Sequence, residues 1–291
     1  MNRQYSTLHK SRIGDSTLAA RLRKELEGEV MFDAFSRGRY STDASIYQIE
    51  PIGVVVPRNQ QDIVRAIQIA GDEGIPVLPR GGGTSQIGQT VGTALIVDTT
   101  KYMNQVLEFD AESRVVSVQP GLVLDQLNRQ LKPRGLFYPV DVSTGNRATL
   151  GGMAGNNSCG ARSIRYGNMV HNVQTIDAIL ADSSAAHFAD LAHTTRDGYC
   201  AELVRNLIEL GRREADEIER RFPQLLRRVG GYNINEIVSS SNANFARLLV
   251  GSEGTLAFFT RLQLELQPIP PHKVLGVCHF PTFHQAMDSA Q

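Results

Sequence analysis

The stretch Pro79-Arg80-Gly81-Gly82-Gly83-Thr84-Ser85 lies between two predicted β-strands, over residues 75–79 and 93–98. Three successive glycines allow positive φ angles and leave no Cβ in the way, so consecutive backbone N–H groups can form a concave nest for phosphate oxygens. Thr84 and Ser85 add hydroxyl donors. A tight structural turn also explains three glycines, so the surrounding sequence has to decide between the two interpretations.

Two familiar phosphate-binding motifs do not fit this stretch. The dinucleotide fingerprint G-x-G-x-x-G fails because Gln86 stands where the third glycine is needed, and a strand follows instead of a helix. Residues 83–90 come near the P-loop pattern, but Gln89 replaces the lysine that must meet the outer phosphates. A Rossmann fold is therefore disfavoured, and a nucleoside-triphosphate site over residues 83–90 remains only a remote alternative.

A second segment, residues 141–160, is dominated by small and polar side chains. A loop of this length in a compact domain is usually functional. An isoalloxazine ring has polar atoms along one edge and flat apolar faces, so backbone donors, hydroxyls and small residues over 143–160 suit it. A mobile surface loop is the alternative interpretation.

The remaining sequence predicts alternating strands and helices. Apolar spacing predicts helices over 18–35, 62–70, 120–133 and 199–221, and strands over 53–57, 75–79, 93–98, 106–109, 114–119, 173–180 and 260–266. Residues 268–271 are typical of a stiff extended linker, followed by a predicted strand over 273–280 and a helix over 283–291. We expect an N-terminal helical extension (1–45), one main domain (46–271) and the beginning of a second, truncated domain (272–291).

Charge and cysteine content exclude several classes of protein. Thirty basic residues balance thirty acidic ones, which removes the positive field that a nucleic-acid-binding protein needs. Cys159, Cys200 and Cys278 are widely spaced and cannot by themselves hold a metal or an iron–sulfur cluster. This cysteine usage favours a reducing, cytoplasmic compartment. No stretch approaches the roughly 20 apolar residues of a transmembrane segment, although a peripheral membrane location stays open.

The histidines show no metal-ligand spacing such as His-x-x-x-His. We expect ordinary surface or packing roles for His9, His187, His193, His272, His279 and His284. His171 follows Tyr166-Gly167 and lies nearer to the glycine-rich segments in sequence.

Five motifs together carry a family resemblance. In order, they are Pro79 to Ser85, Pro120-Gly121, Ala148-Thr149-Leu150-Gly151-Gly152, Tyr166-Gly167 and Gly251-Ser252-Glu253-Gly254-Thr255-Leu256. The set resembles the FAD-binding (PCMH-type) domain of the p-cresol methylhydroxylase and vanillyl-alcohol oxidase superfamily, from about Tyr40 to Pro271. Within that superfamily it is most similar to the D-lactate, glycolate and D-2-hydroxyglutarate dehydrogenase branch.

The resemblance implies an α+β domain of two subdomains, one with a small mixed sheet and one with a larger sheet, with FAD between them. The implied cofactor-binding residues are Arg80, Gly81, Gly82, Gly83, Thr84, Ser85, Gly88, Gln89, Gly121, Ser143, Thr144, Thr149, Gly151, Gly152, Asn156, Asn157, Gly160, Tyr166, Gly167, Val173, Glu253 and Gly254. Some relatives attach the flavin through a histidine in the first glycine loop. Thr84 stands at that place here, so noncovalent FAD is expected.

The implied activity is oxidation of a small D-2-hydroxy acid, such as D-lactate, glycolate or D-2-hydroxyglutarate, by hydride transfer to the flavin. The electrons would then pass to an acceptor protein or a quinone. In this branch the substrate-binding and metal-ligating histidines lie in the second domain, so no catalytic residue and no metal ligand is assigned. The alternative is a flavin-binding subunit or fragment without turnover of its own.

Overall fold

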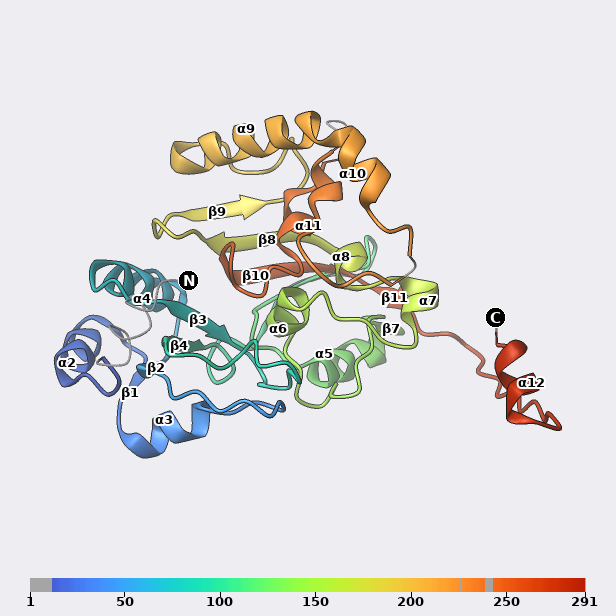
Figure 1. Ribbon diagram of the computed structural model, residues 1–291, viewed down its shortest axis with the longest axis horizontal. Helices are drawn as coiled ribbons and strands as arrows, with labels where there is room; N and C mark the ends of the chain where they lie inside the picture. Colours follow the sequence, from blue (N-terminus) through green and yellow to red (C-terminus); the bar gives the residue numbers. More distant parts are fainter. Residues whose placement is uncertain (1–11, 226, 239–242, 291) are drawn as a thin grey trace.

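The computed structural model describes residues 12–225, 227–238 and 243–290. Their strands form two main sheets, and helices pack against each of them (Figure 1). The smaller sheet has the strand order β1-β2-β4-β3, and the larger has the order β5-β6-β10-β8-β9. The predicted α+β architecture of a small mixed sheet and a larger sheet is confirmed.

The smaller sheet is built on the neighbouring parallel strands β2 and β4. Both are buried on both faces, which explains their unbroken apolar runs. Helices α2 and α4 pack on one face, and Tyr40 at the end of α3 packs on the other. The elements are α2 (Ser16–Glu25), β1 (Glu29–Met31), α3 (Ala34–Tyr40), β2 (Gly53–Val56), α4 (Gln60–Asp72), β3 (Val77–Arg80) and β4 (Leu95–Asp98).

The helix predicted over 18–35 is wrong beyond its first half. Helix α2 ends at Glu25, and β1 then pairs antiparallel with β2. A Cβ on Gly28 would lie 2.3 Å from the carbonyl oxygen of Val56, so the chain passes directly beside β2. This pairing with a distant strand overrides the helical spacing of the apolar residues. Residues 12–45 thus contribute two helices and a strand to the smaller subdomain.

The larger sheet is entirely antiparallel. Its core includes three leucines of α5 at helical spacing, Leu124, Leu127 and Leu131. The sheet strands are β5 (Val106–Asp110), β6 (Val115–Val118), β8 (Val173–Ile179), β9 (Ala185–Phe188) and β10 (Phe258–Glu265). The other elements are α5 (Leu124–Leu131), η1 (Lys132–Arg134), β7 (Leu136–Phe137), α6 (Leu150–Gly155), α7 (Ser163–Tyr166), α8 (Met169–Asn172), α9 (Gly198–Arg213), α10 (Ala215–Arg221), η2 (Ile234–Ile237), α11 (Phe245–Leu249) and β11 (Gln267–Pro268).

Two predicted segments of this subdomain differ in detail. The helix predicted over 199–221 is two helices, α9 and α10, which meet at Glu214. The segment 141–160 is not wholly a loop, because α6 forms within it. Alternating apolar positions do not reveal so short a helix, which depends on capping by Thr149.

The C-terminal segment departs most from prediction. The start of the predicted linker is hydrogen bonded to the larger subdomain. Strand β11 pairs with β7, and the Ile269 N–H donates to the Gly135 carbonyl oxygen, 2.8 Å away. Residues 273–280 form no strand. Val274 and Leu275 are 94% and 88% exposed, and no strand of the described part of the chain pairs with them. Helix α12 (Phe283–Asp288) forms as predicted, away from both sheets (Figure 1).

Within the described residues, no helix combines the length and apolar character needed to cross a membrane.

Candidate cofactor site

A cleft opens where the glycine loop of the smaller subdomain faces α6 and the start of β10. Its lining comes from segments that are far apart in sequence: the end of β3 with residues 81–90, residues 142–158, and residues 253–259. Fourteen of the predicted cofactor residues line it: Arg80, Gly81, Gly82, Gly83, Thr84, Ser85, Gln89, Thr144, Thr149, Gly151, Gly152, Asn156, Glu253 and Gly254. The two glycine-rich segments that the sequence singled out are thus brought to one place.

Gly81 and Gly82 are required because the two glycine-rich segments touch. A Cβ on Gly81 would lie 2.2 Å from the Thr149 hydroxyl oxygen. A Cβ on Gly82 would lie 2.4 Å from the Arg147 carbonyl oxygen. Real Cβ atoms do not approach other atoms so closely, so any larger residue would push the loops apart.

The glycine loop presents backbone donors without protein partners. Among the hydrogen bonds of the described residues, none is donated by a backbone N–H of residues 81–85. Gly83 has a φ of +63°, the left-handed conformation that lets successive N–H groups converge. Backbone N–H groups are normally paired with a hydrogen-bond acceptor, and the Thr84 and Ser85 hydroxyls are further donors in the same lining. This wall of the cleft therefore fits the oxygens of a pyrophosphate.

Helix α6 forms the opposite wall. Thr149 caps it, since its hydroxyl accepts a hydrogen bond from the Gly152 N–H at 3.3 Å. The helix lies close against the preceding turn, because a Cβ on Gly151 would be 2.5 Å from the Cβ of Pro120. The Gly151 N–H donates to the Pro120 carbonyl at 2.8 Å. Small residues here leave room in the cleft for a ligand that lies against the helix.

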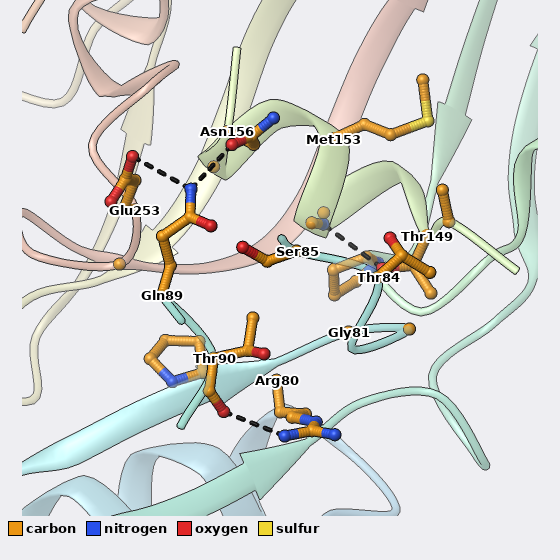
Figure 2. A pocket seen from close by; sticks show the side chains of 18 of the residues that line it. Arg80, Gly81, Thr84, Ser85, Gln89, Thr90, Thr149, Met153, Asn156 and Glu253 are labelled. Atoms are coloured by element: carbon orange, nitrogen blue, oxygen red, sulfur yellow. Dashed lines mark hydrogen bonds between the residues drawn. The ribbon is translucent and has the colours of Figure 1, made fainter. Parts of the chain in front are cut away.

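Three predicted residues meet at one end of the cleft. The Gln89 side-chain amide donates to Asn156 Oδ1 at 2.8 Å and to Glu253 Oε1 at 3.1 Å (Figure 2). Glu253 holds a φ of +54°, uncommon for a residue with a side chain, and its N–H donates to the Gly155 carbonyl at 2.9 Å. We call Gln89, Asn156 and Glu253 the polar bridge; it links the glycine loop, α6 and the turn before β10.

The polar bridge is expected to support ligand binding cooperatively. Gln89→Ala should weaken FAD binding about fivefold, since one hydrogen-bonded group contributes roughly 1 kcal/mol. Glu253→Ala should have a similar effect. The double variant should bind FAD only slightly more weakly than either single variant, because all three remove the hydrogen bond between Gln89 and Glu253. Titration of FAD by isothermal calorimetry measures this, with Gln86→Ala as the matched control on the same loop, where Gln86 is exposed. Strictly additive losses would contradict the coupling.

Arg80 lines the cleft, but its guanidinium is engaged elsewhere. It donates to the carbonyl oxygens of Thr90 at 3.0 Å, Thr42 at 2.8 Å and Tyr40 at 3.4 Å. Burial lowers the pKa of this guanidinium, and the nearby Asp98 carboxylate opposes the shift. Figure 2 shows the side chain turned toward Thr90.

Eight predicted residues do not line the cleft: Gly88, Gly121, Ser143, Asn157, Gly160, Tyr166, Gly167 and Val173. Some have clear structural roles. A Cβ on Gly121 would lie 2.1 Å from the Thr99 carbonyl oxygen, and one on Gly160 would lie 2.2 Å from that of Asp141. Buried Asn157 accepts from the Val170 N–H at 3.0 Å, and Val173 is fully buried in β8.

Further residues line the cleft that were not among the predicted ones: Pro79, Thr90, Thr99, Pro120, Val142, Ala148, Met153, Gly155, Ser158, Ala257, Phe258 and Phe259. Most adjoin residues that were predicted. Phe258 and Phe259 are different, because they begin β10 and resemble any buried strand in the sequence, and Ala257 directly precedes them. Only the packing of this strand behind the cleft reveals them.

Titratable groups are scarce in the cleft. Arg80 and Glu253 are its only ionisable lining residues among those described. His171 lies outside the lining and caps α8, where its Nδ1 accepts from the Asn168 N–H at 2.9 Å. Partial burial lowers the pKa of His171. His9 lies outside the described residues, which contain no cluster of three metal-ligating side chains.

Comparison with known proteins shows what this chain is similar to. Residues 51–189 match the family model described as FAD binding domain. D-2-hydroxyglutarate dehydrogenase of Pseudomonas putida is 33% identical over 99% of this chain, which covers 30% of that protein. Glycolate oxidase subunit GlcD of Bacillus subtilis is 32% identical over 86% of this chain, which covers 44% of it. The chain therefore spans about a third of the length of such relatives.

A solved structure of alkyldihydroxyacetonephosphate synthase shares the fold. It superposes with a TM-score of 0.66 and 18% identity, over 94% of this chain and 44% of the other. Residues 51–189 thus match an FAD-binding domain, and almost the whole chain is similar to part of D-2-hydroxyglutarate dehydrogenase.

Proposed function

We propose that this chain holds FAD noncovalently in the cleft, as the cofactor domain of a dehydrogenase for small D-2-hydroxy acids. The observation that carries the proposal is that the backbone N–H groups of residues 81–85 have no partner among the described residues, in a cleft whose other wall is lined by small residues of α6. Phosphate oxygens need such donors, and a flavin ring needs such a wall. When bound, FAD supplies the hydride acceptor, while the residues of this chain bind and orient it.

The residues we propose for the cofactor are those that line the cleft. The backbone of residues 81–85 would receive the pyrophosphate, and Thr149, Gly151 and Gly152 would lie along the rest of the molecule. The described lining contains no histidine, cysteine or tyrosine that could attach the flavin, which supports noncovalent binding. The domain would extend over residues 46–271 together with the elements of residues 12–45 that complete its smaller sheet, and residues 272–291 would begin a second domain.

The substrate we propose is a D-2-hydroxy acid such as D-2-hydroxyglutarate, D-lactate or glycolate. Its support is the similarity to relatives that carry these names. The reduced cofactor would pass its electrons to an acceptor protein or a quinone. The free, widely spaced cysteines support a cytoplasmic location.

A second candidate is a flavin-binding module that performs no turnover by itself. The lining favours it, because Glu253 is the one carboxylate among the described lining residues and it is already hydrogen bonded to Gln89. Among the lining residues that the structure describes, none carries an imidazole or a phenol that could accept the proton of a substrate hydroxyl.

One experiment tests both candidates. The purified chain is expected to acquire a flavin absorbance spectrum on incubation with FAD, and the cofactor should be released intact on denaturation. Turnover of D-2-hydroxyglutarate, D-lactate or glycolate with an artificial electron acceptor would select the dehydrogenase. Binding without turnover would select the module. A chain that stays colourless after incubation with FAD overturns the proposal.

A further inference from the structure

We propose that Arg80 is a positioning residue, which shapes the glycine loop from behind, and that the pyrophosphate of FAD is bound without a direct contact from this cation. This inference rests on the proposed location of FAD in the cleft. It separates the role of Arg80 from that of the glycines beside it, although all four residues belong to one motif.

The guanidinium connects β3 by hydrogen bonds to two other segments of the chain. Its bonds to the Tyr40 and Thr42 carbonyls hold the segment after α3, and its bond to the Thr90 carbonyl holds the far end of the glycine loop. Arg80 therefore contacts both ends of the glycine loop. Its backbone directly precedes Gly81, and its side chain donates to the Thr90 carbonyl oxygen. Because a planar guanidinium donates along fixed directions, these bonds define where Thr90 lies relative to β3.

Arg80 also determines the turn at Gly83. A Cβ on Gly83 would lie 2.6 Å from Nη2 of Arg80, so this side of the loop backbone rests against the guanidinium. The unpaired N–H groups of residues 81–85 belong to the same short turn. The guanidinium therefore supports the curvature that brings these donors together.

The positive charge of Arg80 is stabilised by an aromatic ring and by carboxylates that do not line the cleft. Its guanidinium lies over the Tyr40 ring, 5.5 Å from the centroid. The Tyr40 hydroxyl donates to buried Asp98 at 2.7 Å, and Asp98 pairs in register with Arg80 across β3 and β4. Asp43 lies on the same side and accepts from the Thr90 hydroxyl at 3.0 Å. The nearest anionic partners are thus carboxylates of the protein itself.

The test compares Arg80→Lys with Arg80→Met in the full chain. Lysine keeps the positive charge but lacks the planar set of N–H donors of a guanidinium. Methionine keeps only an unbranched side chain of similar reach and carries no charge. A positioning role predicts that both variants raise the FAD dissociation constant alike, by about tenfold, and that salt weakens FAD binding equally in both variants and the wild type. If Arg80→Lys retains wild-type affinity while Arg80→Met loses both affinity and salt dependence, Arg80 binds phosphate and the inference is overturned.

Two further measurements separate positioning from a loss of fold. In Arg80→Ala, low concentrations of guanidinium ion should restore FAD affinity, whereas urea of the same shape should not, because only the ion replaces the charged donor. Arg39→Met is the matched control, because Arg39 is exposed and makes no side-chain hydrogen bond among the described residues. Rescue by both additives or by neither contradicts the proposal. Failure of the wild type to bind FAD would instead overturn the proposed function.

Discussion

Gly82→Ala is expected to raise the dissociation constant for FAD by about 100-fold. The added Cβ would lie 2.4 Å from the Arg147 carbonyl oxygen, and both groups belong to backbone that cannot rotate away. Overpacking of this kind costs about 1–3 kcal/mol, and the upper end corresponds to roughly 100-fold in affinity. The glycine loop and residues 147–149 must then separate, which displaces the N–H groups that face the cleft.

The matched control is Gly71→Ala. Gly71 lies in α4 and nothing lies within 4 Å of its Cβ position. Alanine there should stabilise the chain by about 0.5–1 kcal/mol and leave FAD affinity unchanged. Fluorescence quenching of FAD and urea unfolding measure the two quantities. Near-normal FAD binding by Gly82→Ala would show that contact between the two loops does not shape the site.

Phe245→Ala is expected to lower the free energy of unfolding by about 3–5 kcal/mol. Phe245 is fully buried in the core of the larger subdomain, at the first position of α11. Its N–H donates to the Ala189 carbonyl at 2.8 Å, and α11 leads directly to the turn that carries Glu253. The cavity should therefore loosen the wall of the cleft as well as the core.

Urea unfolding of the chain without FAD measures this loss. Phe35→Ala is the control, because Phe35 is 77% exposed and its truncation should change stability by no more than about 0.5 kcal/mol. Excess FAD should recover part of the stability of Phe245→Ala, since a ligand that binds only the folded state stabilises it. Equal effects of the two substitutions would contradict the described packing of α11.

Local sequence features predicted most elements of the two sheets. The runs Val54-Val55-Val56 and Leu95-Ile96-Val97 are apolar without interruption, which suits strands buried on both faces. The leucines of α5 recur at helical spacing and lie in the core as expected. These patterns work because burial and local backbone preference point to the same structure.

The errors occur where contacts between distant residues decide the local structure. Residues 29–31 become a strand because β2 lies beside them, although the apolar spacing continues a helix. Residues 273–280 have the composition of a strand but no partner strand, and isolated strands leave their N–H and C=O groups unpaired. Sequence spacing does not record whether such a partner is present.

The motifs by themselves predict that two glycine-rich segments serve one flavin cofactor, because glycine is needed wherever backbone must approach a ligand or another chain segment closely. The tertiary structure determines which role each residue of these segments has. It pairs Gly82 with Arg147, joins Gln89 to Asn156 and Glu253, and turns the Arg80 guanidinium toward the Thr90 carbonyl. Each of these contacts joins residues that the sequence separates, and the directions of their hydrogen bonds exist only once both sheets have formed.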